Sequence, residues 1–148
     1  MKSNDCEISF DNSFEEVIEQ CSLIKRKKQD GTWIHQKLKD AFVQLHEFGL
    51  AHSVEIRRDN QLIGGLYGLG IGKMFCGESM FAKESNTSKL ALYHLCQKLL
   101  LMGYEFIDCQ QDTKHLRSLG AELISKKKFF EMLEENKRNK LIAEKWPN

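Results

Sequence analysis

The hydrophobic positions in the first half of the chain recur at helical spacing in two segments. Ser13 and Glu16 have the spacing of a capping box and lead into an apolar face that includes Val17, so a short helix is predicted to begin there. A second helix is predicted from about residue 35 to 48, because apolar residues recur every three or four positions up to Gly49, a typical C-terminal stop. The polar run between them, residues 25–31, is predicted to be an exposed loop.

The pattern then changes to short segments rich in β-forming residues and glycine. Asp59-Asn60 and a second glycine-containing turn separate three such segments, residues 53–58, 61–69 and 73–81, which predicts a three-stranded antiparallel meander. The glycines are dense, at positions 64, 65, 68, 70 and 72. Because glycine weakens a strand, either a ligand that lies against the hairpin or a tight, irregular hairpin must explain this density.

The second half of the chain returns to helices, with one further strand among them. A long helix capped by Asn86, Thr87 or Ser88 ends at Gly103, and it is expected to be buried because apolar residues surround much of its girth. A strand over residues 104–110, a short helical piece near 115–119 and a final helix from about 125 follow. The charged tail, residues 137–148, is expected to fray.

This order predicts one α/β (α+β) domain, residues 1–148, in which helices flank a mixed sheet. The strands before and after the long helix should be parallel neighbours joined by a right-handed crossover. A chain of 148 residues encloses one sizeable core and is too short to favour two domains. Ligands of such sheets bind beyond the strand ends or where neighbouring strands part, so the site is expected there.

Composition excludes several classes of protein. The apolar runs fall far short of the roughly 20 residues that cross a bilayer, and Asp5 and Glu7 interrupt the N-terminus where a signal peptide is apolar. The five cysteines form no C-x-x-C pair and the histidines no H-E-x-x-H motif, so no metal site is expected. No phosphate-loop or dinucleotide-binding glycine motif occurs, and no cofactor is expected. These features are typical of a cytoplasmic protein without a membrane partner.

The basic residues are clustered although the net charge is only +1. Three runs, Lys25–Lys28, Arg57-Arg58 and Lys126–Lys128, are either solvated faces or contacts with a polyanion. Contacts with nucleic-acid phosphates would be salt-sensitive and independent of base sequence.

Three polar residues interrupt apolar strands: Glu78, Asp108 and Gln110. Because side chains alternate along a strand, Asp108 and Gln110 are expected to project to the same side and to contact one ligand together. A satisfied core network, or a strand end that reaches solvent, would explain one such residue, whereas three on adjacent strands favour a site. Cys76 and Ser79 remain as candidate nucleophiles outside any G-x-S-x-G motif.

Seven segments are similar to the motifs of one family, in that family's order. They are Gly31-Thr32-Trp33-Ile34, Leu45-His46-Glu47, Ala51-His52-Ser53-Val54-Glu55, Gly64-Gly65-Leu66-Tyr67-Gly68, Phe75-Cys76-Gly77-Glu78-Ser79-Met80-Phe81, Ile107-Asp108-Cys109-Gln110 and Ser118-Leu119-Gly120-Ala121. Over residues 10–130 the chain thus resembles the leucyl/phenylalanyl-tRNA–protein transferases. It resembles a short form of them, because members usually carry an additional N-terminal domain.

The resemblance implies a fold like that of the GNAT acetyltransferases and an aminoacyltransferase activity. Leucine, phenylalanine or methionine would pass from aminoacyl-tRNA to the N-terminal Arg or Lys of a protein, which marks that protein for N-degron degradation. The implied substrate-binding residues are Trp33, which would stack on the terminal adenosine of the tRNA, and Leu66, Phe75 and Met80, which would contact the transferred side chain. The implied catalytic residues are Glu78, Asp108 and Gln110.

The chemistry of such a transfer is undemanding, since an aminoacyl ester is already activated. An α-amino group with a pKa near 7.7 to 8.0 is roughly one-tenth neutral at pH 7, so no strong base is required. We therefore expect Asp108 to orient Gln110, the Gln110 amide oxygen to accept a hydrogen bond from the incoming amine, and Glu78 to position the ester or its free amino group. Positioning should supply most of the rate.

Two other functions remain open. The first is an acyl-CoA-dependent N-acetyltransferase on the same architecture, although residues 81–89 lack the glycine-rich loop that would bind a pyrophosphate. The second is a non-catalytic module that binds tRNA or protein N-termini.

Overall fold

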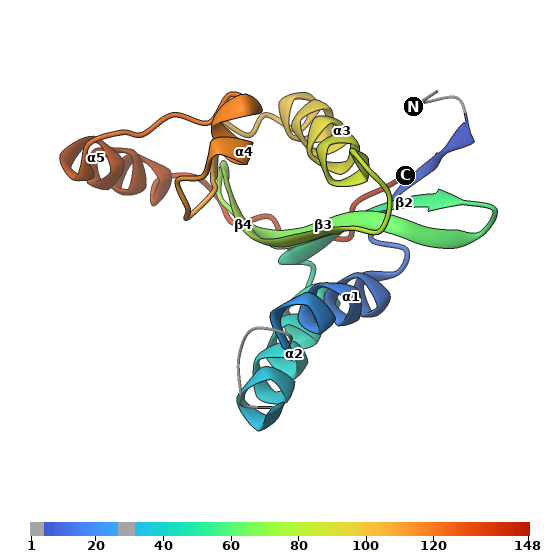
Figure 1. Ribbon diagram of the computed structural model, residues 1–148. Coiled ribbons are helices and arrows are strands. Elements are labelled where there is room, and N and C mark those ends of the chain that lie inside the picture. The colour runs from blue at the N-terminus through green and yellow to red at the C-terminus, as the bar shows by residue number, and fades with distance from the viewer. Residues whose placement is uncertain (1–4, 27–31) are drawn as a thin grey trace.

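A single mixed sheet with helices on both faces forms the centre of the protein (Figure 1). The computed structural model describes residues 5–26 and 32–148, without the side chains of residues 25, 26 and 32–35. The strands in this part are β1 (Glu7–Phe10), β2 (Ala51–Arg58), β3 (Gln61–Ile71), β4 (Met74–Ala82) and β5 (Phe106–Asp108). The helices are α1 (Phe14–Arg26), α2 (Thr32–Glu47), α3 (Thr87–Leu101), α4 (Lys114–Ser118) and α5 (Lys126–Asn136).

The strands lie side by side in chain order, β1 to β5. The predicted meander is confirmed, since β2, β3 and β4 pair antiparallel, and β4 pairs with β5 in parallel as expected from the long helix between them. β1 was not predicted. It is four residues long and pairs antiparallel with β2, through contacts such as Ile8 with Ile56, at one edge of the sheet.

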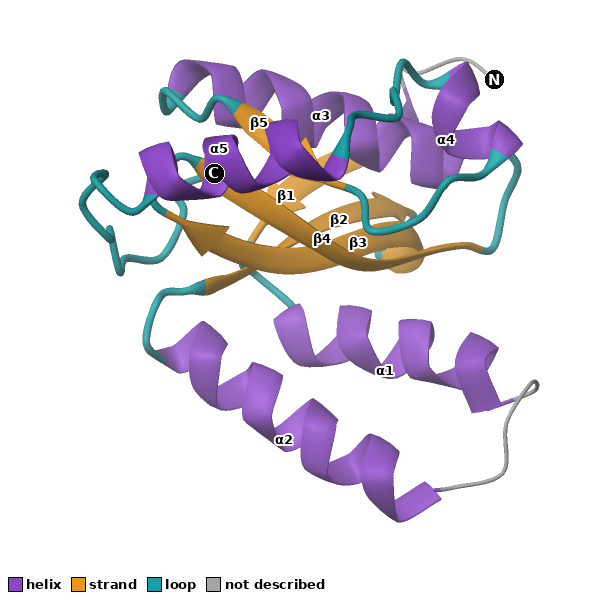
Figure 2. Cartoon of the chain, turned by 90° about the vertical axis from the view of Figure 1, so that its left-hand side faces the viewer, coloured by secondary structure: helices purple, strands orange, loops and turns teal. Residues whose placement is uncertain are grey.

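Each face of the sheet is covered by its own helices (Figure 2). α1 and α2 pack on one face around an apolar cluster of Phe14, Val17, Ile18, Cys21, Phe42, Ala51, Leu62, Tyr67 and Phe81. α3 packs on the other face around Val54, Ile56, Ile63, Leu66, Phe75, Ala91, Leu95, Leu99 and Trp146, here called the α3 cluster. The prediction that α3 is buried holds for only part of its surface. The helix buries one face, and Tyr93 and Leu100 on the opposite face are 58% and 70% exposed.

Two helix starts and two predicted caps illustrate how local signals work in this chain. α1 begins at Phe14 as predicted, but the Ser13 hydroxyl and the Glu16 carboxylate both accept hydrogen bonds from Arg57 instead of forming a capping box. α5 begins where predicted, and its N-cap residue Ser125 accepts a hydrogen bond from the Lys128 N–H. Asn86 occupies the N-cap position of α3 without a side-chain cap bond.

The dense glycines of β3 make room for the protein's own side chains. A Cβ atom would overlap Thr87 at Gly64, the ring of Phe75 at Gly68 and the hydroxyl of Tyr104 at Gly70. Because close packing within the domain fills these positions, the structure favours the tight, irregular hairpin over a ligand laid along it.

The C-terminal tail does not fray as expected. Trp146 is buried at 2% exposure, and Asn148 accepts a hydrogen bond of 2.8 Å from the Phe10 N–H of β1. A tail rich in charge is therefore held by its few apolar and amide side chains. In the part of the chain that the structure describes, no helix combines the length and apolar character needed to cross a membrane.

Candidate functional site

The candidate site lies where β4 and β5 stop pairing. The two strands are paired only from Met74–Phe106 to Cys76–Asp108, after which β5 ends and β4 continues to Ala82. Just beyond the last pair, β4 carries a bulge. Its register against β3 passes from Gly77 to Ser79, so that Glu78 is the extra residue without a partner. Strand ends that part in this way were the place predicted for a ligand.

The three predicted catalytic residues meet at this point. The Gln110 side-chain amide donates hydrogen bonds to the Gly77 carbonyl oxygen at 2.9 Å and to Glu78 Oε1 at 3.1 Å. The Gln110 backbone N–H donates to Asp108 Oδ1 at 2.9 Å. Because both hydrogen atoms of the amide group are used, its carbonyl oxygen is the atom left to accept a hydrogen bond from a ligand.

A turn, rather than strand alternation, brings Asp108 and Gln110 together. β5 ends at Asp108, so the expectation that both residues share one side of a strand is wrong. The Asp108 carboxylate instead accepts a hydrogen bond from the Gln110 N–H, two residues further on, as in an Asx-turn. The Gln111 N–H donates to the Cys109 carbonyl at 2.7 Å, which closes a three-residue turn whose central residue, Gln110, has a φ of 60°. A three-residue turn with positive φ is strained, and such strain is concentrated at functional sites.

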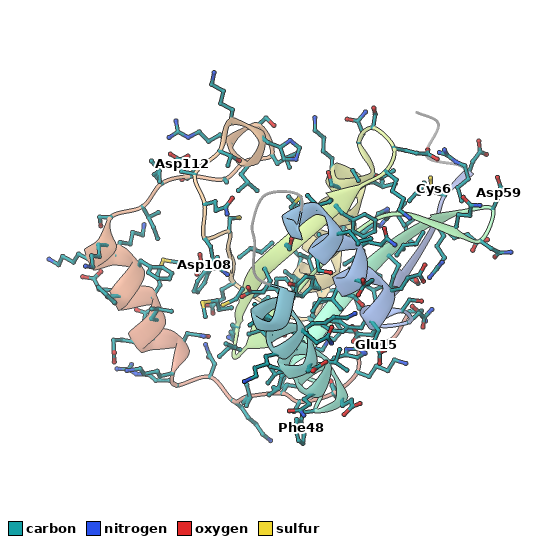
Figure 3. All side chains as sticks on the ribbon, turned by 60° about the horizontal axis from the view of Figure 1, so that its bottom comes forward. Cys6, Glu15, Phe48, Asp59, Asp108 and Asp112 are labelled. Atoms are coloured by element: carbon teal, nitrogen blue, oxygen red, sulfur yellow. The ribbon has the colours of Figure 1, made fainter. Side chains whose placement is uncertain are left out.

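A cavity of about 740 Å³ lies beside this point, and two of the three residues, Asp108 and Gln110, are part of its wall. Figure 3 shows Asp108 and Asp112 on the segment that leads from the sheet to α4 and α5. The lining contains three carboxylates, those of Asp108, Asp112 and Glu122, and one cationic side chain, that of Lys126. The charge of the lining is therefore negative. The remaining wall is mainly apolar and includes Leu92, Ile107, Leu116, Leu119, Leu123, Ile124, Phe129 and Met132.

The electrostatics of the site argue against a thiol nucleophile. Burial, reinforced by the negative charges of Asp108 and Glu78, raises the pKa of Cys76 to about 11. Burial also raises the pKa of Cys109. Since the thiolate is the reactive form, Cys76 is a poor nucleophile near neutral pH. Among the described residues, no three His, Cys, Asp or Glu side chains are grouped to hold a metal ion.

The predicted substrate-binding residues occupy two places. Leu66 and Phe75 are buried in the α3 cluster, and the half-buried Met80 packs against it, together with Ile107 from β5. Trp33 lies in the first turn of α2, and its side chain is outside the described part of the structure. The three apolar residues therefore share one region of the sheet, on the face that α3 covers.

A second polar cluster, on β1 and β2, was not singled out from the sequence. Asp11 is buried and accepts hydrogen bonds from the Ser53 N–H at 2.9 Å and the Trp146 N–H at 2.8 Å, and its Oδ2 lies 2.8 Å from His52 Nδ1. Glu55, also buried, accepts from Ser9 Oγ at 2.6 Å, Ser53 Oγ at 2.5 Å and the Ser13 N–H at 3.3 Å. The polar positions of the segment Ala51-His52-Ser53-Val54-Glu55 were the available signal.

Comparison with known proteins identifies relatives along nearly the whole chain. A family model described as leucyl/phenylalanyl-tRNA protein transferase matches residues 1–134. The protein named leucyl/phenylalanyl-tRNA–protein transferase from Hydrogenovibrio crunogenus is 50% identical to this chain over 139 residues, which cover 94% of this chain and 54% of that protein. The protein of that name from Nitrosomonas europaea is 45% identical over 148 residues, covering 99% of this chain and 61% of its own length. The chain thus spans a little over half the length of the curated relatives it matches.

Solved structures with the same fold are more distant in sequence. An aminoglycoside acetyltransferase from an uncultured soil metagenomic sample, solved in complex with sisomicin, has a TM-score of 0.59 at 12% identity and covers 100% of this chain and 99% of its own. A ribosomal-protein-alanine N-acetyltransferase from Brucella melitensis biovar Abortus 2308 has a TM-score of 0.58 at 11% identity and covers 81% of this chain and 93% of its own. These likenesses confirm the expected GNAT-like fold. The sequence matches go further, and they show that the chain belongs to the leucyl/phenylalanyl-tRNA–protein transferase family.

Proposed function

We propose that this domain is an aminoacyltransferase that moves leucine or phenylalanine from aminoacyl-tRNA to the N-terminal α-amino group of a protein. The observation that carries the proposal is the fixed amide of Gln110. Its NH₂ group is bonded to Gly77 and Glu78, its backbone is bonded to Asp108, and its carbonyl oxygen is left to accept a hydrogen bond. Membership of the family supplies the substrate class.

In the proposed reaction, the neutral α-amine attacks the carbonyl carbon of the aminoacyl ester. A C–N bond forms, the C–O bond to the ribose breaks, and the proton lost by the amine ends on the released ribose hydroxyl. The Gln110 oxygen accepts a hydrogen bond from the amine, which directs the nitrogen lone pair at the ester. Glu78 positions the ester or its free amino group, and Asp108 fixes the turn that carries Gln110. Holding the reactants together in this way is worth several kcal/mol.

The acceptor protein is proposed to enter through the cavity beside Gln110. The negative charge of Asp108, Asp112 and Glu122 complements a basic N-terminal residue, Arg or Lys. Asp112 is paired with Arg117, which leaves Asp108 and Glu122 as the carboxylates best placed to meet the incoming cation. The apolar wall suits the aliphatic stem of such a side chain.

The transferred side chain is proposed to lie against Leu66, Phe75 and Met80, in the region that α3 covers. An apolar pocket discriminates by only about 1 to 3 kcal/mol per methylene, so acceptance of leucine, phenylalanine and methionine is expected. Trp33 is proposed to stack on the terminal adenosine of the tRNA, a contact worth about 1 to 3 kcal/mol.

The three basic runs differ in what they offer to tRNA phosphates. Arg57 and Arg58 are paired with Glu16 and Glu84, whereas Lys126–Lys128 are exposed at the start of α5. Lys126, the first of these lysines, lines the cavity. The run Lys25–Lys28 is not described beyond the backbone of its first two residues. We therefore assign the acceptor-stem contact to Lys126–Lys128.

The reaction would take place in the cytoplasm, where charged tRNA is available, and would mark its product as an N-degron.

Transfer of labelled leucine from leucyl-tRNA to peptides that begin with Arg, Lys, Asp or Ala tests the proposal. Product on Arg and Lys alone is expected. Product on Asp or Ala would contradict the assigned acceptor specificity, and no product on any peptide would contradict the catalytic assignment in favour of a binding module. Stabilisation by acetyl-CoA in a thermal-shift titration would instead support an N-acetyltransferase.

A further inference from the structure

The C-terminal segment, residues 137–148, crosses the end of the sheet and joins parts of the chain that are far apart in sequence. At its start, the Asn136 side chain donates to the Ile71 carbonyl and accepts from the Lys73 N–H, both at 2.8 Å, which holds it to the turn between β3 and β4. At its end, the Trp146 N–H donates to Asp11 and Asn148 accepts from Phe10. Figure 1 shows this red trace returning beneath the strands to end near β2.

The segment also passes tightly behind Gly49, the residue that ends the turn after α2. A Cβ atom at Gly49 would collide with the backbone of Ala143 and Glu144, and its φ of 77° favours glycine as well. The segment is thus anchored at these points and at the buried Trp146, whereas most of its other residues, such as Leu141 and Ile142, are exposed.

The ring of Trp146 is the centre of an aromatic group at this end of the α3 cluster. It stacks on the His52 ring at a centroid distance of 4.0 Å and an angle of 5°. Its centroid lies 5.7 Å from that of Phe75, and Phe10 and Tyr104 approach its ring edge-on at 6.4 and 6.3 Å. His52 in turn contacts Asp11, so the indole stacks on a ring that is itself held in place.

Phe75 connects this group to the proposed pocket for the transferred side chain. It is fully buried, and Gly68 on β3 leaves room for its ring. Three residues further along β4 is Glu78, and Leu66 and Met80 belong to the same apolar region as Phe75. The position of the Phe75 ring therefore sets how much space remains near the reacting ester.

We infer that Trp146 is a positioning residue for substrate selection: it holds the Phe75 ring in place and so limits the size of the aminoacyl side chain that the site accepts. This inference rests on the proposed function, in which Phe75 contacts the transferred side chain. Interiors pack closely, so removal of the indole would open space into which the Phe75 ring can move. The space gained on the other side of Phe75 would favour the larger substrate.

The test compares Trp146→Ala and Trp146→Phe with Asn148→Ala, which loosens the same segment but has no contact with Phe75. For each protein, kcat and KM are measured with leucyl-tRNA and with phenylalanyl-tRNA, and binding of leucyl- and phenylalanyl-adenosine amides is measured by calorimetry. Trp146→Ala should raise the preference for phenylalanine over leucine about tenfold, mainly through KM. Trp146→Phe should shift it less in the same direction, and Asn148→Ala should leave it unchanged within about twofold.

Equal losses with both substrates in folded Trp146 variants would overturn the inference, because they would show that the indole only stabilises the domain. If Trp146→Ala fails to fold by circular dichroism, Trp146→Phe decides, and an unchanged preference in that variant overturns the inference. A wild-type protein that neither transfers an amino acid nor binds either adenosine amide would contradict the proposed function itself. A wild-type protein that does both, beside variants of unchanged preference, would contradict only the role of Trp146.

Discussion

The carboxylates of Asp11, directly after β1, and of Glu55, on β2, are enclosed, whereas Asp108 and Gln110, at and after the end of β5, border a cavity. Asp11 and Glu55 are each buried and each have three hydrogen-bond partners, which come from β2, from neighbouring segments and from the C-terminal tail. Gln110 is exposed, and its amide oxygen is left over after both amide hydrogens are bonded. Both groups consist of polar residues that lie in or directly after short apolar strands, so the same sequence signal has two structural outcomes.

The difference shows what separates a structural polar cluster from a candidate site. In the described part of the chain, no buried side-chain nitrogen or oxygen atom is without a hydrogen-bond partner. The β1–β2 cluster thus uses its hydrogen-bonding capacity within the protein, which stabilises the fold. The cluster of Glu78, Asp108 and Gln110 keeps capacity for a ligand and includes a strained turn.

The largest expected effect follows from removing a carboxylate from each cluster. Asp11→Ala leaves the Ser53 and Trp146 N–H groups and the His52 ring without their acceptor and should lower the free energy of unfolding by about 3 to 5 kcal/mol. Asp108→Ala removes one hydrogen bond at a half-buried position and should cost about 1 kcal/mol. Urea unfolding of both variants measures the difference. Equal losses would show that the two clusters are alike in their contribution to stability.

The rate of leucine transfer is expected to depend on the cluster that contains Gln110. Gln110→Ala should lower kcat/KM for leucine transfer about 100-fold, because it removes the acceptor for the incoming amine and frees Glu78 from its contact. Gln97→Ala, at an exposed position of α3 outside the lining of the cavity, is the matched control and should transfer at the wild-type rate. Normal transfer by Gln110→Ala would remove Gln110 from the mechanism.

Much of the fold followed from the sequence because its signals are local. The glycine and polar turns between β2, β3 and β4, and the signals for a helix that starts near residue 125, each act within a few residues of the element they define. β1 was missed because it has four residues and owes its existence to pairing with β2, more than 40 positions away. The docked tail was missed for the same reason, since the partner of Trp146 is Asp11.

That the three residues of the candidate site lie together could be predicted from the sequence, whereas their geometry could not. A carboxylate or amide in an apolar strand is unusual in any single sequence, and this singled out Glu78, Asp108 and Gln110. The bulge that releases Glu78 and the turn at Gln110 depend on pairing between strands and on a positive φ that glutamine rarely adopts. Neither feature leaves a pattern in the residues around it.

A change of at least tenfold is expected in the rate at which the Cys76 thiol is alkylated. Cys76 lies on β4, close to the cluster of Glu78, Asp108 and Gln110. Its pKa of about 11 exceeds the ordinary value of 9.0, so alkylation by iodoacetamide at pH 9 should be at least tenfold slower in the folded protein than in urea. The neutral thiol stabilises the folded state below pH 9, and this contribution is lost as pH rises through about 11. Peptide mapping by mass spectrometry follows Cys76 separately. Equal rates in the two states would contradict the burial of a neutral thiol beside these carboxylates.

The smallest expected difference in stability concerns the residue of each cluster that has a left-handed backbone conformation. These residues are Asp11, with a φ of 56°, and Gln110, with a φ of 60°. Glycine adopts positive φ without strain, so Gln110→Gly should be more stable than Gln110→Ala by about 1 kcal/mol, while both lose transfer. Asp11→Gly relieves the same backbone strain but removes the buried acceptor, and it should remain several kcal/mol less stable than the wild type. Urea midpoints of the three variants measure these differences. If Gln110→Gly were no more stable than Gln110→Ala, the turn at Gln110 would not be strained. The position of Gln110 would then depend only on its contacts with Asp108 and Glu78.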